Sequence, residues 1–160
     1  MAEEQQGLEA KILTVSDGVA AGTREDKSGA ALAKLLAERG FSVVDHRVIT
    51  DGAREVAAAI EVMSVGFAGL IVTTGGTGFG PRDETPEGTK MVIERDAPGL
   101  AEAMRLANPL GRLSRAVAGS RGEALVCNLP GSSSGALECL SSILDVVPHA
   151  LELLRGGRPH

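Results

Sequence analysis

The sequence predicts an α/β protein: a single three-layer α/β/α domain around a mostly parallel, doubly wound sheet. Short apolar runs of β character alternate along the chain with segments of helical spacing, which is typical of strands joined by helical crossovers. The length of 160 residues suits one hydrophobic core, and 43% apolar with 23% charged residues is a globular composition. We therefore assign residues 1–160 to one domain, with frayed tails at 1–9 and 155–160.

The first half of the chain supplies three expected strands. They are the apolar or β-branched runs 10–15, 41–49 and 68–74. Ser28 is expected to open a helix that Gly40 closes, and a second helix is indicated by the spacing of Val56, Ile60 and Met63. A strand, a helix, a strand, a helix and a strand thus follow one another, as in a parallel sheet.

The second half continues the alternation. Thr85 and Pro86 resemble the cap and the first residue of a helix. The other expected elements are a helix over 99–107, short strands over 114–119 and 124–128, and a last helix that starts in the serine-rich turn 132–134. Pro148 is expected to break or kink this last helix.

Composition argues against nucleic acid and membranes as partners. A net charge of −5, with no Trp, no Tyr and three Phe, provides neither a basic stripe nor ring platforms for bases. No apolar stretch approaches the roughly twenty residues that cross a bilayer, and the first residues are acidic and polar where a secretory signal is basic and then apolar. Two cysteines are too few for a disulfide framework, so we expect a reduced, cytoplasmic protein.

Polar loops follow four of the predicted strands. These loops, at 14–18, 50–52, 73–83 and 128–134, are rich in Gly, Ser, Thr, Asp or Asn. In an open parallel sheet, ligands bind beyond the carboxyl ends of the strands. We therefore expect the four loops to line one cleft.

The loop T-T-G-G-T-G-F-G-P-R-D at 73–83 carries four glycines, whose bare amides can approach an anion closely. It leads to a helix N-terminus, which also favours negative charge. It is neither a Walker loop nor a dinucleotide fingerprint, because no Gly-Lys-Ser/Thr follows and the glycine spacing differs. A plain turn is the alternative, but we favour a phosphate-binding loop in which Arg82 is an additional cation.

Asp51 and Asp83 each follow a predicted strand and can meet in this cleft. Paired carboxylates there can hold Mg²⁺, act as acid and base, or cap backbone N–H groups. Beside a phosphate-binding loop, Mg²⁺ bridged to phosphate is the most economical role. The capping alternative is strong for Asp51, since Thr-Asp-Gly is a common turn signal, and weaker for Asp83, because Thr85 is expected to cap the helix.

Five strings resemble the Mog and MoaB family of molybdenum cofactor biosynthesis proteins, to which the gephyrin G domain is also similar. In chain order they are T-V-S-D, A-G-T-R-E-D-K-S-G, T-T-G-G-T-G-F-G-P-R-D-E-T-P-E, L-S-R-A-V-A-G and N-L-P-G-S. The resemblance covers about 11–154 and implies a three-layer fold, usually a homotrimer, that binds molybdopterin. Its adenylyltransferase members join the terminal phosphate of molybdopterin to the α-phosphate of Mg-ATP and release pyrophosphate.

By motif position, the resemblance implies that Asp51 and Asp83 are the essential acidic residues. It implies that molybdopterin and ATP are bound by Ser16, Asp17, Asp26, Ser28, Thr74, Gly75, Gly76, Thr77, Gly78, Arg82, Ser114, Asn128, Pro130, Gly131 and Ser132. Ser133 and Ser134 stand where many members have Pro and Lys, so the cleft edge has one positive charge fewer.

Two alternatives to adenylyl transfer stay open. One is a MoaB-type trimer that binds molybdopterin without catalysis. The other is hydrolysis of a nucleotide pyrophosphate bond, which the CinA-like relatives suggest. Release of pyrophosphate from ATP in the presence of molybdopterin distinguishes the transferase from the passive binder.

Overall fold

The strand order brings the carboxyl ends of the parallel strands together. The computed structural model describes residues 7–157, and within them six strands form one sheet in the order β2-β1-β3-β6-β5-β4. The parallel strands are β1 (Leu8–Val15), β2 (Phe41–Ile49), β3 (Leu70–Thr74) and β6 (Ala124–Leu129). β5 (Ala118–Arg121) is antiparallel to both β6 and β4 (Arg95–Asp96). The predicted α/β class with a mostly parallel sheet is confirmed.

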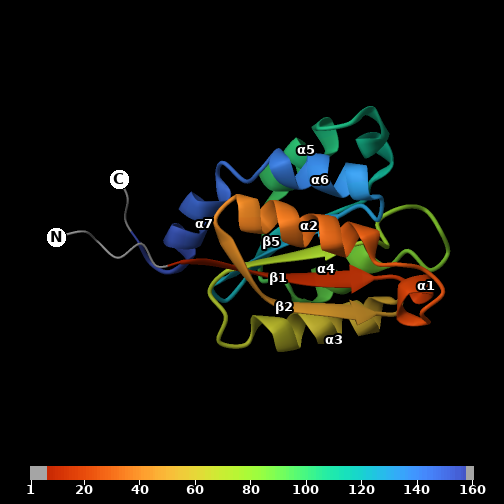
Figure 1. The fold of residues 1–160 in the computed structure, drawn as a ribbon. Coiled ribbons are helices and arrows are strands. Elements are labelled where there is room, and N and C mark those ends of the chain that lie inside the picture. The colour runs from red at the N-terminus through yellow and green to blue at the C-terminus, as the bar shows by residue number, and fades with distance from the viewer. Residues whose placement is uncertain (1–6, 158–160) are drawn as a thin grey trace.

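Helices cover both faces of the sheet, which gives the three predicted layers (Figure 1). One face carries α2 (Lys27–Glu38), α5 (Pro98–Leu106), α6 (Ser133–Ser141) and α7 (Val147–Leu154), and the other carries α3 (Ala53–Ser64) and α4 (Thr85–Val92). Successive side chains of a strand point to opposite faces, so Ile12 packs into the core under α2 and Leu13 into the core under α3. The central strands are therefore apolar throughout.

Two short helices lie in the segments that connect the longer elements. α1 (Asp17–Ala20) directly follows β1, and Ser16 caps it by accepting a hydrogen bond from the Val19 N–H at 3.3 Å. The 3₁₀ helix η1 (Pro109–Leu113) follows α5, and Asn108 caps it in the same way through the Leu110 N–H. Neither short helix was predicted, because four or five residues are too few to show a helical period.

Two helix starts differ from the predictions. α2 begins at Lys27, and its cap is Asp26 rather than Ser28, because Asp26 Oδ1 accepts a hydrogen bond from the Gly29 N–H at 3.0 Å. Thr85 is the first residue of α4 and not its cap. The Thr85 hydroxyl is fully buried and donates to the carbonyl oxygen of Gly75 at 2.8 Å, since the glycine loop folds back over the start of this helix.

The predicted ends of the chain and one strand also need correction. Leu8 and Glu9 are not frayed, because they pair with β2 as the start of β1. Residues 155–157 follow α7 in a turn, whereas 1–6 and 158–160 lie outside the described residues. The strand expected over 114–119 begins only at Ala118, because the preceding segment bonds to the glycine loop. The break expected at Pro148 is confirmed, since this proline lies in the first turn of the separate helix α7.

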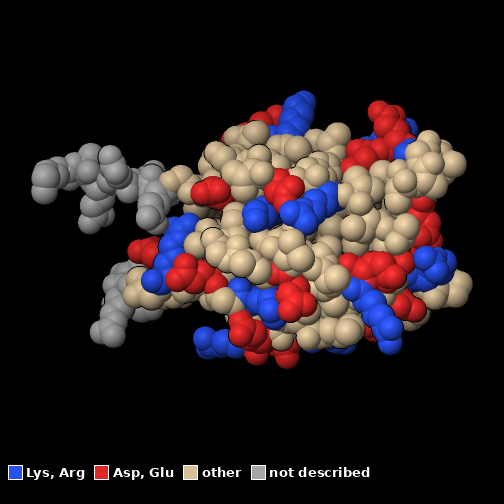
Figure 2. Space-filling view, turned by 90° about the horizontal axis from the view of Figure 1, so that it is seen from below, with Lys and Arg blue, Asp and Glu red and all other residues tan. Residues whose placement is uncertain are grey.

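Charges are mixed on the surface that carries α3. Figure 2 shows acidic and basic side chains interspersed on this face rather than gathered into a stripe of one sign. Among the described residues, no helix combines the length and the apolar character needed to cross a bilayer.

Candidate functional site

A cleft of about 610 Å³ opens at the carboxyl edge of the parallel strands, where the loop composition predicted it. The ends of β1 and β3, the loop after β2, the start of α2 and the turn before α6 form its walls. The predicted residues that line it are Ser16, Asp26, Ser28, Asp51, Thr74, Gly75, Gly76, Asp83, Gly131 and Ser132. The tertiary structure therefore brings together residues from all four predicted loops and from the start of α2.

A smaller hollow of about 390 Å³ adjoins this cleft on the far side of the glycine loop. It shares Gly76, Asp83 and Gly131 with the cleft, and its other predicted residues are Thr77, Gly78, Ser114 and Pro130. Leu110 and Leu113 of η1 complete its wall. The glycine loop and Asp83 thus stand between a polar cleft and a partly apolar hollow.

Glycine is required at the turn that follows β3. Gly75 and Gly76 have φ angles of 102° and 70°, which side-chain-bearing residues rarely adopt. A Cβ on Gly75 would lie 2.2 Å from the Val15 carbonyl oxygen, and a Cβ on Gly76 would lie 2.2 Å from Thr85 Oγ1. The bare backbone therefore follows from both the turn and the close approach of β1 and α4.

The backbone amides of this loop fall into two groups. The Gly75 N–H donates to the Leu129 carbonyl at 3.1 Å, so this amide is already bonded, contrary to the expectation that it meets a phosphate. The N–H groups of Gly76, Thr77 and Gly78 have no hydrogen-bond partner within residues 7–157. Three successive unpartnered amides at a sheet edge can donate to an anionic ligand.

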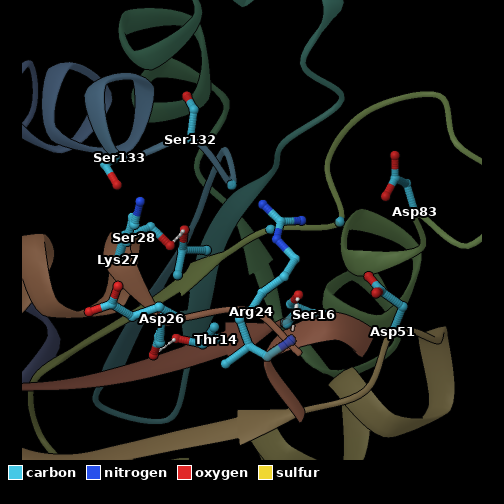
Figure 3. Close-up of a pocket in the computed structure, with 17 residues that line it drawn as sticks. Thr14, Ser16, Arg24, Asp26, Lys27, Ser28, Asp51, Asp83, Ser132 and Ser133 are labelled. Carbon is cyan, nitrogen blue, oxygen red and sulfur yellow. Dashed lines mark hydrogen bonds between the residues drawn. The ribbon is translucent and has the colours of Figure 1, made fainter. Parts of the chain in front are cut away.

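Asp51 and Asp83 approach the cleft from two different loops (Figure 3). Asp51 Oδ2 accepts a hydrogen bond from the Asp17 N–H at 3.0 Å, and Asp83 Oδ2 accepts one from the Gly80 N–H at 2.9 Å. Burial raises the pKa of Asp51 above its ordinary value, and the negative charges of Asp17 and Asp83 add to this effect. Asp51 and Asp83 are therefore close enough for their charges to interact.

This pair of carboxylates suits Mg²⁺. In both side chains, Oδ1 has no hydrogen-bond partner among the described residues. Mg²⁺ is commonly held by one or two carboxylates, with waters and substrate phosphates completing its octahedral shell. The described part of the chain contains no group of three or more His, Cys, Asp or Glu side chains arranged to hold a metal, so an ion here would need oxygens from a bound ligand.

Asp17 and Arg82 bond to each other instead of lining the cleft. The Arg82 Nε and Nη2 groups donate to the two Asp17 carboxylate oxygens at 2.5 and 3.1 Å, and Nη2 also donates to the Asp51 carbonyl at 3.1 Å. The Arg82 guanidinium holds the pKa of Asp17 below its usual range. Their charges compensate each other at the rim, and the expectation that both side chains contact substrate stays a prediction.

Asp26, Ser28 and Thr74 form the polar floor of the cleft. Asp26 Oδ2 accepts a hydrogen bond from the Thr14 hydroxyl at 2.9 Å and lies 3.0 Å from His46 Nε2. The Thr74 hydroxyl donates to the Pro130 carbonyl at 2.8 Å and lies 3.1 Å from Ser28 Oγ. These contacts hold the start of α2, β1, β3 and the turn before α6 in register around the cleft.

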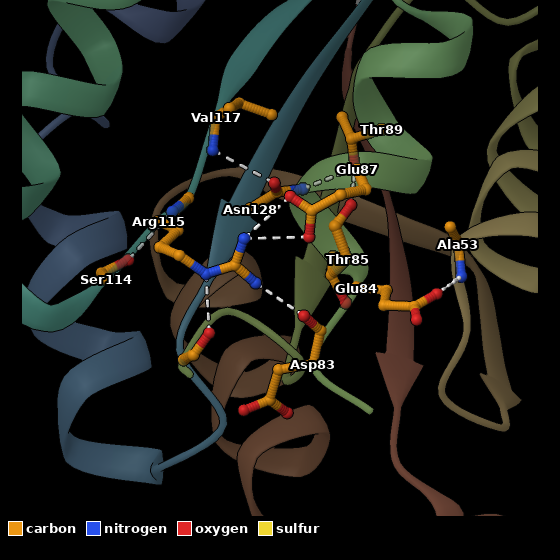
Figure 4. Close-up of polar contacts among 12 residues, drawn as sticks. Ala53, Asp83, Glu84, Thr85, Glu87, Thr89, Ser114, Arg115, Val117 and Asn128 are labelled. Atoms are coloured by element: carbon orange, nitrogen blue, oxygen red, sulfur yellow. Dashed lines mark hydrogen bonds and ion pairs between the residues drawn. The ribbon is translucent and has the colours of Figure 1, made fainter. Parts of the chain in front are cut away.

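Asn128 does not line the cleft, although the family resemblance implies that it binds substrate. It is fully buried, because alternation along β6 turns its side chain toward α4. Its Oδ1 accepts from the Val117 N–H at 3.1 Å, and its Nδ2 donates to the Thr73 and Thr89 hydroxyls at 3.0 and 2.9 Å (Figure 4). Asn128 is thus a structural cross-link between β6, β3 and α4.

Two basic side chains that the sequence prediction does not include, Arg24 and Lys27, line the cleft. Neither side chain has an ion-pair or hydrogen-bond partner within the described residues. The stem of Arg24 lies over Gly18, where a Cβ would be 2.7 Å from Arg24 Cδ. Figure 3 shows the Arg24 guanidinium within the cleft and Lys27 reaching toward Ser133. Their position inside the string A-G-T-R-E-D-K-S-G was the available signal.

The parallel sheet carries these amides, two carboxylates and two cations at its carboxyl edge. This arrangement is typical of an α/β domain that binds a phosphorylated small molecule. Residues 11–149 match the family model described as "Probable molybdopterin binding domain". The chain therefore belongs to the molybdopterin-binding domain family that includes the Mog and MoaB proteins of molybdenum cofactor biosynthesis.

Relatives of known name cover nearly the whole chain. A molybdopterin adenylyltransferase from Helicobacter pylori strain J99 is 35% identical over 95% of this chain and 90% of its own length. The structure of MoaB from Thermus thermophilus is 42% identical with a TM-score of 0.87, covering 93% of this chain and 97% of that one. The Mog protein from Mycobacterium ulcerans is 40% identical with a TM-score of 0.85, covering 92% and 99% of the two chains.

Proposed function

We propose that this protein binds molybdopterin and transfers AMP from Mg-ATP to its terminal phosphate. The observation that carries the proposal is the convergence on the cleft and its adjoining hollow of two carboxylates, three amides and two cations, the amides and cations being unpartnered within residues 7–157. A volume of about 610 Å³ lies within the ordinary range of small-molecule sites. The name of the Helicobacter pylori relative, molybdopterin adenylyltransferase, agrees with this activity.

The proposed reaction requires little proton transfer by groups of the protein. An oxygen of the terminal phosphate of molybdopterin attacks the α-phosphorus of ATP, the bond from this phosphorus to the bridging oxygen breaks, and pyrophosphate leaves with the electron pair. The attacking oxygen is already anionic at neutral pH, so no strong general base is needed. What the reaction needs is in-line placement and charge compensation of two polyanions.

The residues of the cleft and its adjoining hollow match these needs. Asp51 and Asp83 would hold Mg²⁺ through their Oδ1 atoms, and bound Mg²⁺ supplies charge compensation at the reacting phosphates. The N–H groups of Gly76, Thr77 and Gly78 would donate to phosphoryl oxygens without having to reorganise. Arg24 and Lys27 would compensate the remaining negative charge, and Lys27 offsets the Lys that the Ser134 position lacks.

We also propose a homotrimer, as the family resemblance implies. Several large apolar side chains of the monomer are exposed, among them Leu106 (86%), Leu110 (73%) and Leu113 (58%), which lie together at the end of α5 and in η1. Such a surface is available for burial between subunits. Sedimentation equilibrium of the purified protein tests the trimer, and a monomer mass would contradict it.

The test of the proposed function is pyrophosphate release. The protein is incubated with molybdopterin, ATP and Mg²⁺, and pyrophosphate and adenylyl-molybdopterin are measured. Stoichiometric formation of both products supports the proposal, whereas molybdopterin binding without either product would identify a passive binding protein. Breakdown of ADP-ribose in the absence of pterin would instead support hydrolysis of a nucleotide pyrophosphate bond.

A further inference from the structure

Arg115 joins both ends of the loop that carries Asp83 (Figure 4). Its Nε donates to the Gly78 carbonyl at 2.7 Å, and its Nη2 donates to the Asp83 carbonyl at 2.6 Å. Its Nη1 donates to both carboxylate oxygens of Glu87 in α4, at 2.9 and 2.8 Å. One planar guanidinium thus connects the beginning of the loop, its end and the helix that follows it.

The backbone of Arg115 also holds the glycine loop. The Arg115 N–H donates to the Thr77 carbonyl at 2.9 Å. In a trans peptide the N–H points away from the carbonyl of the same peptide unit, so fixing the Thr77 carbonyl turns the Gly78 N–H away from Arg115. The orientation of one amide of the site therefore depends on this contact.

Asp83 lies at the last position of a tight turn with Pro81 at the second position. The Asp83 N–H donates to the Gly80 carbonyl at 3.0 Å, and the Gly80 N–H donates back to Asp83 Oδ2 at 2.9 Å. These two bonds fix the carboxylate relative to its own turn. They do not fix the turn relative to the rest of the site. Arg82 links the turn to the Asp51 carbonyl. The contacts of Arg115 anchor Asp83 to Glu87 of α4.

We infer that Arg115 is a positioning residue, which sets the Asp83 carboxylate and the Gly78 amide at their working distance from Asp51. Arg115 lines neither the main cleft nor the smaller hollow. Lysine cannot replace it, because a compact ammonium group cannot bond two carbonyls and a carboxylate with the geometry of a planar fork. The kinetic part of this inference rests on the proposed function, and the structural part does not.

The test compares Arg115→Lys with the control Arg112→Lys. Arg112 lies three residues away, is exposed, and donates through Nε to the Pro109 carbonyl of η1. Hydrogen–deuterium exchange of the peptide covering 76–84 is measured, together with kcat, the KM for ATP and the Mg²⁺ concentration for half-maximal rate. Melting temperatures report any general loss of stability.

In Arg115→Lys, amides of 76–84 should exchange faster than in the wild type, while those of α2 stay unchanged. We expect kcat to fall by about tenfold or more because a small displacement of a reacting group has a large effect on rate, with the KM for ATP changed less than about twofold. The half-maximal Mg²⁺ concentration should rise. Arg112→Lys should match the wild type in all four measurements.

Glu87→Gln provides a second variant should Arg115→Lys fail to fold. This variant keeps both carbonyl contacts of Arg115 and removes the negative charge with which Arg115 pairs. The exchange rate of 76–84 should therefore lie between those of the wild type and Arg115→Lys. Wild-type exchange over 76–84 in a folded variant overturns the inference, whether or not pyrophosphate is released. Faster exchange in a protein whose wild type releases no pyrophosphate would contradict the proposed function and leave the positioning role standing.

Discussion

Asp17 and Asp51 each bind the backbone N–H of the other. The Asp17 N–H donates to Asp51 Oδ2 at 3.0 Å, and the Asp51 N–H donates to Asp17 Oδ1 at 3.1 Å. This reciprocal pair joins the loop after β1 to the loop after β2 and fixes one oxygen of Asp51. The Arg82 guanidinium forms its ion pair with Asp17 and not with the neighbouring Asp51 carboxylate. The charge of Asp17 is therefore compensated, and the Asp51 carboxylate has no ion-pair partner among the described residues.

The raised pKa of Asp51 leads to a prediction about stability and pH. Ionising Asp51 costs more free energy in the folded than in the unfolded protein. This cost lowers the stability of the folded protein above the folded-state pKa, and it disappears below the unfolded-state pKa of about 3.9. Asp51→Asn should therefore be slightly more stable than the wild type at pH 7, and this difference should shrink as the pH falls toward about 3. Urea unfolding at several pH values measures it. A difference that grows on acidification would contradict the stated cause.

Asp83 is predicted to be needed for turnover more than for binding. Asp83→Asn keeps an oxygen that can accept from the Gly80 N–H but removes the negative charge from the cleft. We expect kcat to fall by about a hundredfold or more, as for the loss of other transition-state electrostatic groups, while molybdopterin affinity is largely retained. Stopped assays for pyrophosphate and equilibrium binding separate the two effects. Unchanged turnover would remove Asp83 from the mechanism.

Arg24 and Lys27 are predicted to bind the polyphosphate. Each side chain is unpaired within the described residues and lines the cleft, so replacing either with Gln should weaken Mg-ATP binding by about threefold to tenfold at low salt. Higher ionic strength should reduce this difference, because exposed charges are screened. Lys34→Gln, at an exposed position of α2, the helix that begins at Lys27, is the matched control. Titration calorimetry at two salt concentrations measures the effect, and equal losses in all three variants would contradict a specific role.

Gly76 is predicted to be irreplaceable for two separable reasons. Its φ of 70° costs alanine about 1–2 kcal/mol, and a Cβ there would also meet Thr85 Oγ1 at 2.2 Å. Gly40 shares the first reason, with a φ of 87°, but has nothing within 4 Å of its Cβ position in the part of the chain that the structure describes. Gly76→Ala should therefore destabilise the protein more than Gly40→Ala and also lower its activity. Equal free energies of unfolding in the two variants would show that the contact with Thr85 is unimportant.

The periodicity of the chain was sufficient to predict its layers. Strands buried on both faces must be continuously apolar, as in 70–74, and helices that cover a sheet must repeat their apolar residues at helical spacing, as in α2 and α3. Loops after parallel strands must meet at one edge, so Asp51, Gly76 and Gly131 could be assigned to one cleft before any contact was known. These features follow from local backbone geometry, so the sequence predicts them directly.

Periodicity does not reveal which partner a polar side chain finds. Asn128 and Ser132 belong to the same short motif, yet strand alternation buries the first against α4 and leaves the second at the cleft. Thr85 has the sequence of a helix cap, but the carbonyl of Gly75 reaches its hydroxyl. Such choices depend on atoms that are distant in sequence.

The residues alone thus determined the layered α/β architecture, the sheet edge that carries the site and most of the side chains around it. Only the tertiary structure decided that Arg82 turns to Asp17, that Arg115 holds the loop of Asp83, and that Arg24 and Lys27 face the cleft with no partner among residues 7–157. The physical reason is that an arginine or lysine side chain is long and flexible. Its hydrogen-bond partner is set by which carbonyls and carboxylates the folded backbone brings within reach.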